Sequence, residues 1–213
     1  EIVGLAGLVG AGRSELAQAI FGIAPAQSGE ILIDGKRVRI RHPGDAMRLG
    51  IAYVPEERGS QGLIKQMNIR ENVSLAVLRT LTKGPFIDRA GDKSLARRTI
   101  DQLNIRAYSI NQVVNKLSGG NQQKVVIGKW LASKPRILIM DEPTRGIDVG
   151  AKFEIYRIID ELAREGAGLL VISSEIEELM GICDRILVMR KGEIGGEFER
   201  AAFDRERILR AAL

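Results

Sequence analysis

Five short apolar runs recur along this 213-residue chain and constrain its fold more than any other feature. Each run is rich in Ile, Val and Leu and stays apolar at successive positions, whereas a strand with one face in water alternates apolar and polar residues. Such runs are typical of strands covered on both faces, which predicts a parallel sheet. The runs span residues 2–6, 51–54, 137–140, 169–172 and 186–189.

Helical patterns separate these runs. Ile155, Ile158, Ile159 and Leu162 fall at positions i, i+3, i+4 and i+7 and therefore share one face of a helix. Asp148 ahead of them either caps this helix or belongs to the preceding loop. Strand and helix periods that alternate in this order predict a doubly wound α/β sandwich.

The segment from about residue 68 to residue 115 follows a different pattern. Apolar residues such as Ala96, Ile100 and Leu103 recur there at helical spacing, and no buried-strand run interrupts them. We therefore predict an inserted helical subdomain at about residues 68–115 of a single domain that spans residues 1–213. A composition of 45% hydrophobic and 28% charged residues is ordinary for one such globular domain.

Composition also excludes several classes of protein. A single cysteine, Cys183, cannot make a disulfide framework, and a single histidine, His42, cannot build a His/Cys metal site. No apolar run approaches the roughly 18–20 residues of a membrane span, and the N-terminus carries no signal pattern. Because the chain opens at Glu1, without Met, inside a strand-like run, we expect it to be a segment of a longer protein.

The net charge of +5 is compatible with an anionic partner but too small to indicate one. Arg37, Arg39 and Arg41 alternate with Val38 and Ile40, which predicts a strand with its basic side in water. Aromatic residues make up only 4% of the chain and none interleaves with these arginines, so we expect no nucleic-acid partner.

A glycine-rich stretch follows the first run and precedes a helical pattern. It satisfies the phosphate-loop pattern G-x-x-x-x-G-K-[ST] at every position except the lysine, which is Arg13. Glycines let backbone N–H groups surround a phosphate, and the Ser14 hydroxyl can ligate Mg²⁺. Arginine keeps the charge but has a wide planar fork, so we expect binding to survive better than catalysis. A simple tight turn is the alternative. The candidate nucleotide-binding residues of this loop are Gly7, Leu8, Val9, Gly10, Ala11, Gly12, Arg13 and Ser14.

Two carboxylates end the apolar run at residues 137–140. Asp141 and Glu142 stand at the carboxyl end of a predicted parallel strand, which is where ligands of open α/β sheets bind. Asp141 is a candidate Mg²⁺ ligand, directly or through water, and Glu142 is a candidate catalytic residue that orients the attacking water. Alternatively, the pair merely starts a turn before Pro143.

A third motif closely resembles the signature of ATP-binding-cassette ATPases. It comprises Leu117, Ser118, Gly119, Gly120 and Asn121, followed by two glutamines, a helix and then the strand that ends in the two carboxylates. The resemblance implies a P-loop NTPase sandwich with a mainly parallel central sheet, with ATP and Mg²⁺ as cofactors. It also implies that two cassettes pair head to tail, so that these five residues contact the ATP held by the partner.

The wording of the motifs resembles the second cassette of double-cassette ATPase subunits in bacterial importers of ribose, xylose, galactose and similar sugars. This implies a first cassette in the same polypeptide, or a second copy, and transmembrane permease subunits that dock on residues 56–66 and the helical block. A periplasmic or external sugar-binding protein would be an indirect partner. The implied location is peripheral, at the cytoplasmic face of the bacterial inner membrane. The resemblance also implies that this sequence begins after the upstream strands of the family, one of which carries the aromatic residue that stacks on adenine, so we expect the adenine contact to lie outside it.

Three positions depart from the family pattern. Besides Arg13, Glu56 stands where the family has a glutamine; it can still reach Mg²⁺ and is a third candidate Mg²⁺ ligand, but it puts a negative charge near the γ-phosphate. Ser174 replaces a histidine that contacts the γ-phosphate. His42 lies too far upstream to substitute. Glu142 and Asp148, whose loop touches the partner cassette, are retained. The resemblance therefore implies weak or absent hydrolysis at this chain's own phosphate loop, and an intact signature that completes the partner's site.

Two other functions stay open. A regulatory cassette that binds nucleotide without hydrolysing it is compatible with the three departures. A cassette ATPase that acts on nucleic acid or ribosomes is the other alternative, although residues 56–117 hold no long coiled coil of the kind found in chromosome-maintenance ATPases.

Overall fold

The structure is a computed structural model that describes the backbone of residues 1–213 and every side chain except that of Lys83. The chain divides into two compact units. The sheet unit comprises Glu1–Tyr53, Pro135–Glu142 and Asp160–Leu213, and the helical unit comprises Val54–Lys134 and Pro143–Ile159.

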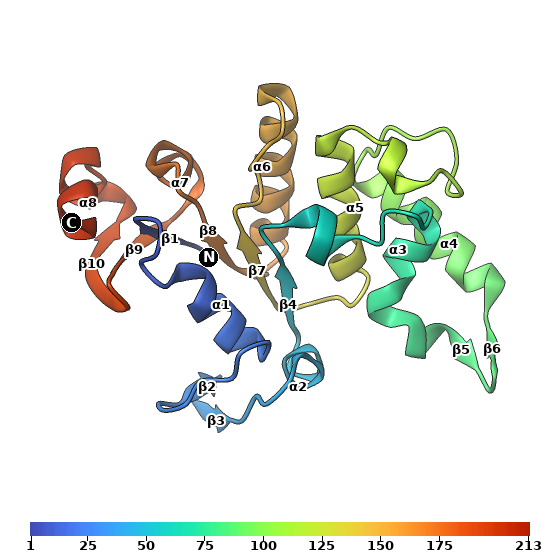
Figure 1. Cartoon of the computed structure of the whole chain (residues 1–213), viewed down its shortest axis with the longest axis horizontal. Helices are drawn as coiled ribbons and strands as arrows, with labels where there is room; N and C mark the ends of the chain where they lie inside the picture. The colour runs from blue at the N-terminus through green and yellow to red at the C-terminus, as the bar shows by residue number, and fades with distance from the viewer. The chain divides into compact units, whose positions relative to one another are not determined.

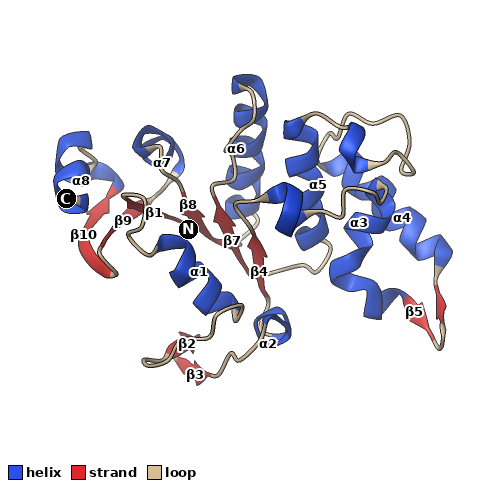
Figure 2. Ribbon diagram, in the orientation of Figure 1, coloured by secondary structure: helices blue, strands red, loops and turns tan.

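A six-stranded sheet organises the sheet unit, with the strand order β10-β9-β1-β8-β7-β4. β1 pairs in parallel with β8 and β9, and β7 pairs in parallel with β8 (Figure 2). The five predicted apolar runs correspond to five of these strands, so the prediction of a mainly parallel sheet is confirmed. Their bounds are β1 Ile2–Gly7, β4 Ile51–Val54, β7 Ile137–Asp141, β8 Gly168–Ile172 and β9 Arg185–Arg190.

The sixth strand, β10 (Glu193–Glu199), was not predicted. It pairs antiparallel with β9 and is mostly exposed, so it lacks the apolar run that marks the other five. Its register shifts between Ile194 and Gly196. Sequence periodicity does not reveal an exposed edge strand that contains two glycines and a bulge.

Helices cover both faces of this sheet. α1 packs against β1 and β7, α7 packs against β1, and α8 packs against β9 and β10. Figure 1 shows α1 on one side of the sheet and α7 on the other, which confirms the doubly wound arrangement. The bounds are α1 Arg13–Phe21, α2 Pro43–Arg48, α7 Ile176–Ile182, η4 Arg200–Ala202 and α8 Arg205–Ala212.

Close packing beside β1 depends on a glycine. A Cβ at Gly4 would lie 2.9 Å from the Cys183 sulfur, so only a residue without a side chain lets α7 and its C-terminal Cys183 approach the strand this closely. Cys183 is fully buried, as expected for a small apolar residue, and burial raises the pKa of its thiol to about 12. The thiol is therefore protonated and unreactive at neutral pH.

The basic stretch at residues 37–41 is only partly a strand. β3 (Lys36–Val38) pairs with β2 (Ile31–Ile33) and ends before Arg39. The predicted alternation persists, because Arg37, Arg39 and Arg41 are exposed while Ile40 is buried.

The helical unit is built around α3, α4 and α5, which pack against one another. α3 begins with a capping box in which Asn68 and Glu71 each accept a hydrogen bond from the other's backbone N–H. α5 begins at Gly119, so the two glutamines that follow the signature motif already belong to this helix. The bounds are η1 Arg58–Gly62, α3 Ile69–Ser74, η2 Leu75–Leu81, β5 Thr82–Lys83, β6 Phe86–Ile87, α4 Arg89–Gln102, η3 Val114–Lys116 and α5 Gly119–Leu131.

The helix α6 (Val149–Arg164) contributes residues to both units. Ile155, Ile158, Ile159 and Leu162 are all buried, which confirms the predicted apolar face. Within the described residues, each helix is too short or too polar to cross a membrane.

Candidate functional site

The glycine-rich loop lies in the sheet unit between β1 and α1. Gly10 and Gly12 have φ values of 82° and 99°, a left-handed conformation that residues with side chains rarely adopt. Leu8 and Val9 are exposed at its tip, and Ser14 stands in the first turn of α1. The loop therefore joins an exposed turn to a helix N-terminus, the combination that phosphate-binding loops use.

Arg13, in contrast, points into the protein. Only 9% of the residue is exposed, and its Nη1 donates a hydrogen bond of 2.7 Å to the Ser173 carbonyl, just after β8. Its Nη2 lies 3.5 Å from Oε1 of Glu142, just after β7. Arg13 occupies the motif position whose cation binds phosphate, but its guanidinium instead contacts Ser173 and Glu142.

Asp141, the last residue of β7, is 1% exposed. Burial raises the pKa of its carboxyl, and hydrogen bonds from the side chains of Ser14 and Tyr53 partly oppose this shift. The Tyr53 hydroxyl donates to Oδ2 at 3.0 Å, whereas Oδ1 is buried and lacks a hydrogen-bond partner among the described residues. A buried carboxylate oxygen without a partner, beside a serine hydroxyl, fits the oxygen ligands that Mg²⁺ prefers.

Glu142 has a left-handed backbone conformation, and its carboxylate contacts two other side chains. Its φ is 47°, and its N–H donates to the Ile172 carbonyl at 2.9 Å. Its Oε2 accepts a 3.2 Å hydrogen bond from the Ser174 hydroxyl, while Oε1 faces Arg13. Burial raises the pKa of this carboxyl, and the charge of Arg13 and the hydrogen bonds from Ser174 work in the opposite direction. The sheet unit thus brings Glu142 together with two predicted nucleotide contacts, Arg13 and Ser174.

The signature residues lie in the helical unit, at the start of α5. Ser118 is the N-cap residue, and Gly119 and Gly120 already belong to the helix. The Ser118 hydroxyl accepts a 2.8 Å hydrogen bond from Asn121, whose side-chain oxygen accepts another from the Arg106 backbone. Leu117 is 8% exposed, so its side chain belongs to the core.

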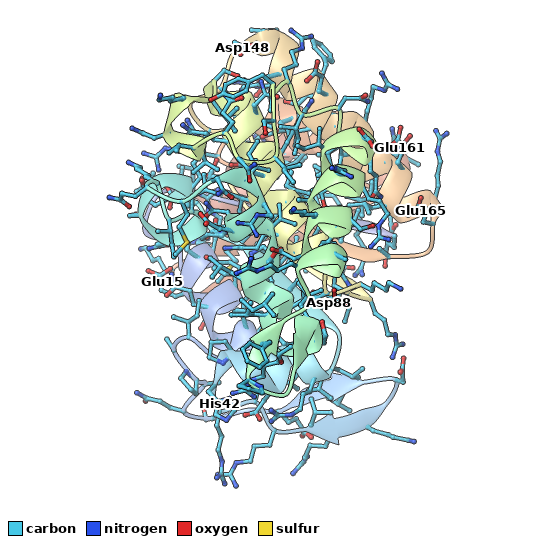
Figure 3. All side chains as sticks on the ribbon, turned by 90° about the vertical axis from the view of Figure 1, so that its right-hand side faces the viewer. Glu15, His42, Asp88, Asp148, Glu161 and Glu165 are labelled. Carbon is cyan, nitrogen blue, oxygen red and sulfur yellow. The ribbon has the colours of Figure 1, made fainter. Side chains whose placement is uncertain are left out.

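A pocket of about 170 Å³ opens beside these residues. Asp148 lies on its wall and caps α6, because its Oδ1 accepts a 2.9 Å hydrogen bond from the Ala151 N–H (Asp148 is labelled in Figure 3). The motifs predicted four of the lining residues, and the other four were not predicted; two of these, Arg106 and Glu154, have charged side chains. The lining residues are Arg106, Ser118, Gly120, Asn121, Asp148, Gly150, Ala151 and Glu154.

Glu56 belongs to the helical unit, where its carboxylate forms an ion pair with Arg145. The other two predicted Mg²⁺ ligands, Ser14 and Asp141, belong to the sheet unit, where their side chains are hydrogen-bonded. His42 is the N-cap residue of α2 and lies 3.5 Å from the Asp45 carboxylate.

A glycine-rich loop between a central parallel strand and a helix, with an acidic pair at the end of a nearby strand, defines a P-loop nucleotide-binding fold. The sequence model of the family described as ABC transporter matches residues 1–145. This chain belongs to the ABC transporter family.

Several curated relatives match the whole chain. The ribose import ATP-binding protein RbsA 1 of Agrobacterium fabrum is 52% identical over 212 residues, which is 100% of this chain and 42% of that protein. The ribose import ATP-binding protein RbsA of Geobacillus kaustophilus is 50% identical, with 100% of this chain and 43% of that protein covered. The chain thus spans about two fifths of the length of these relatives.

Solved structures agree with the fold. A bacterial ABC transporter cassette, solved as a dimer, has a TM-score of 0.80 and 25% identity, covering 95% of this chain and 87% of that one. A nucleotide-free cassette from an ABC transporter has a TM-score of 0.82 at 20% identity and covers 100% and 88%.

Proposed function

We propose that this chain is one ATP-binding cassette, with a helical subdomain at about residues 68–115, of an ATPase subunit that powers sugar import. The relatives are named ribose import ATP-binding proteins, and these names support a sugar as the imported substrate. Because the chain spans about two fifths of those relatives, a first cassette in the same polypeptide is the proposed partner, with a second copy as the alternative. The assembly would work peripherally, at the cytoplasmic face of the bacterial membrane, with permease subunits that receive sugar from an external binding protein.

The contact between Arg13 and Glu142 carries the mechanistic part of the proposal. A cassette that hydrolyses ATP needs a cation at the phosphates and a carboxylate that orients water. Here the cation and the carboxylate lie 3.5 Å apart, and each is additionally hydrogen-bonded, to Ser173 and Ser174 respectively. We propose that this arrangement makes the chain's own phosphate site degenerate, with weak or absent hydrolysis in isolation.

The remaining contacts of this site support binding rather than turnover. Backbone N–H groups of the loop between Gly7 and Ser14 would hold the phosphates. Ser14 and the free Oδ1 of Asp141 would hold Mg²⁺, which supplies positive charge against the phosphates when bound. Glu56 remains a proposed third contact, and it would have to leave Arg145 to serve as one.

We propose that the pocket beside Ser118, Asn121 and Asp148, called the signature pocket below, binds the ATP that the other cassette holds. Ser118, Gly119 and Asn121, supported by Asp148, would complete the first cassette's site by contacting its ATP. The exposed N-cap position of Ser118 and the hydrogen bond that orients its hydroxyl support this role.

Two substitutions in the assembled transporter test whether this chain contributes to hydrolysis through its signature residues and not through its own phosphate loop. Ser118→Arg should abolish ATP hydrolysis, because a bulky cation would fill the signature pocket. Arg13→Ala should leave most of the activity. Hydrolysis is measured as phosphate release at saturating ATP, with thermal unfolding as the control for folding. The opposite ranking of the two variants would contradict the proposal.

One alternative has a specific observation in its favour. The engaged Glu142 carboxylate is also what a regulatory cassette that never hydrolyses ATP would show. That function predicts nucleotide binding together with transporter ATPase activity that is unaffected by Ser118→Arg.

A further inference from the structure

Three separate segments of the helical unit meet at Arg58, in the π-helical turn η1 that follows β4. Its Nη1 donates to the Arg145 carbonyl at 2.7 Å, and its Nη2 donates to the Gly146 carbonyl at 3.1 Å. One planar guanidinium thus bridges two successive carbonyls of the loop that leads to Asp148. Such a two-pronged contact fixes orientation as well as distance, which a lysine ammonium cannot reproduce.

The same guanidinium lies against the start of α5. A Cβ built on Gly119 would stand 3.0 Å from Nη2 of Arg58 and 3.3 Å from the Gly146 carbonyl oxygen. The signature helix, the loop at residues 145–147 and Arg58 are therefore in direct contact. Gly146 has a φ of 66°, so a glycine there lets both carbonyls turn toward Arg58.

The segment just before η1 and the last residue of η1 are anchored as well. On one side, the Glu56 carboxylate pairs with the Arg145 side chain. On the other, the buried Lys129 of α5 donates a 2.6 Å hydrogen bond to the Gly62 carbonyl, and a Cβ at Gly62 would meet Val126 at 2.9 Å. The turn η1 is therefore held to α5 and to the loop before α6 at the same time.

We infer that Arg58 is a positioning residue for the signature pocket. It holds Ser118 and Gly119 at the start of α5 in a fixed relation to Asp148 at the start of α6, so that the pocket is formed before a nucleotide arrives. This inference rests on the proposed function, because the nucleotide concerned is the one held by the other cassette. Preorganised donors act on a ligand without a cost of rearrangement at the moment of contact.

Hydrogen–deuterium exchange of the 213-residue chain tests the structural half. Arg58→Ala removes two charge-assisted hydrogen bonds, so the backbone N–H groups of residues 147–151 and 120–122 should exchange about tenfold faster. Arg58→Lys should fall between this variant and the unaltered chain. Arg98→Ala removes the same charge from an exposed position of α4 and should change neither segment. Unchanged exchange at residues 147–151 in Arg58→Ala would overturn the inference.

Steady-state ATPase kinetics of the assembled transporter test the functional half. Arg58→Ala should lower kcat about tenfold and leave KM for ATP within about twofold, because the first cassette's phosphate loop is untouched. Rates are normalised to nucleotide bound per subunit, which corrects for unfolded protein, and Arg58→Lys should recover part of kcat. If Ser118→Arg abolishes hydrolysis but Arg58→Ala leaves kcat unchanged, the positioning role of Arg58 is refuted. Intact hydrolysis in Ser118→Arg would instead refute the proposed function, while the exchange measurement would still decide the Arg58 contact.

Discussion

The guanidinium of Arg13 lies 3.5 Å from the carboxylate of Glu142, and the two side chains are only 10% and 11% exposed. This contact joins the first turn of α1 to the end of β7. Breaking a largely buried ion pair from one side leaves the other charge without its partner, which costs more than an exposed pair contributes. The contact is therefore expected to persist in solution and to compete with phosphate for Arg13.

Arg13→Lys should release this competition. A lysine is too compact to reach both the Ser173 carbonyl and Glu142, and its ammonium matches the phosphate-loop pattern. We expect the chain to bind ATP about tenfold more tightly, a change of about 1.4 kcal/mol. Titration with a fluorescent ATP analogue measures it, with Arg13→Ala as the control that removes the charge. Equal affinities of the unaltered chain and Arg13→Lys would show that Arg13 does not weaken binding.

Asp141→Asn should stabilise the chain at neutral pH in the absence of divalent cations. Burial raises the carboxyl pKa above its ordinary value of 3.8, so the native state binds the proton more tightly than the unfolded chain does. Stability from this group is full below pH 3.8 and is lost as the pH rises through the native pKa. At neutral pH we expect the free energy of unfolding of Asp141→Asn to exceed that of the unaltered chain by about 1 kcal/mol, or about 2–4 °C in Tm. This difference in stability should become smaller as the pH falls toward 4.

Mg²⁺ provides the matched measurement for Asp141. A cation held by Asp141 and Ser14 stabilises the native state by mass action, so Mg²⁺ should raise the Tm of the unaltered chain and not that of Asp141→Asn. An equal rise in both proteins would place the cation elsewhere.

Because of Lys129, the free energy of unfolding should change with pH in the alkaline range. Burial lowers the pKa of its ammonium from 10.5 to about 8, so the native state releases the proton more readily than the unfolded chain does. Its contribution to stability is full above pH 10.5 and is lost as the pH falls through 8. Relative to Lys129→Met, the free energy of unfolding of the unaltered chain should therefore rise between pH 8 and 10.5, by up to about 3 kcal/mol. Urea unfolding across this range measures the slope, and Lys93→Met, at an exposed lysine, should show none.

Two helical glycines should respond oppositely to alanine. At Gly128, in α5, a Cβ would lie 2.3 Å from the Thr99 methyl of α4, so Gly128→Ala should destabilise the chain by about 1–3 kcal/mol. At Gly181, in α7, a Cβ would meet no atom within 4 Å, so Gly181→Ala should stabilise it by about 0.4–1 kcal/mol. Thermal unfolding of both variants tests the packing of α4 on α5. A neutral Gly128→Ala would mean that these helices separate easily.

Sequence pattern was sufficient for the strands that are mostly buried. The five strands β1, β4, β7, β8 and β9 are marked by their apolar runs, because a strand covered on both faces has no polar positions. β10 escaped prediction because it is held by tertiary contacts. A Cβ at its Gly195 would stand 2.4 Å from the Ala211 carbonyl of α8, a constraint that no local pattern contains.

The candidate site divides along similar lines. Motif spacing indicated the phosphate loop, Asp141 and the signature residues, because each motif lies within one short segment. The engagement of Arg13 by Glu142 and of Glu56 by Arg145 depends on contacts between distant segments, which the spacing of residues does not encode. Arg58 was missed for the same reason.

The place of β1 in the sheet has a consequence for biosynthesis. The strand that carries the phosphate loop is bordered by β8 and β9, and both are drawn from the last quarter of the chain. While the polypeptide emerges from the ribosome, β1 must wait without neighbours until nearly all of this segment has been made. Pairings between such distant residues form slowly and leave apolar edges open to aggregation. The nucleotide site is thus among the last parts of the sheet unit to form, and we expect chains released before β9 to be recognised by chaperones.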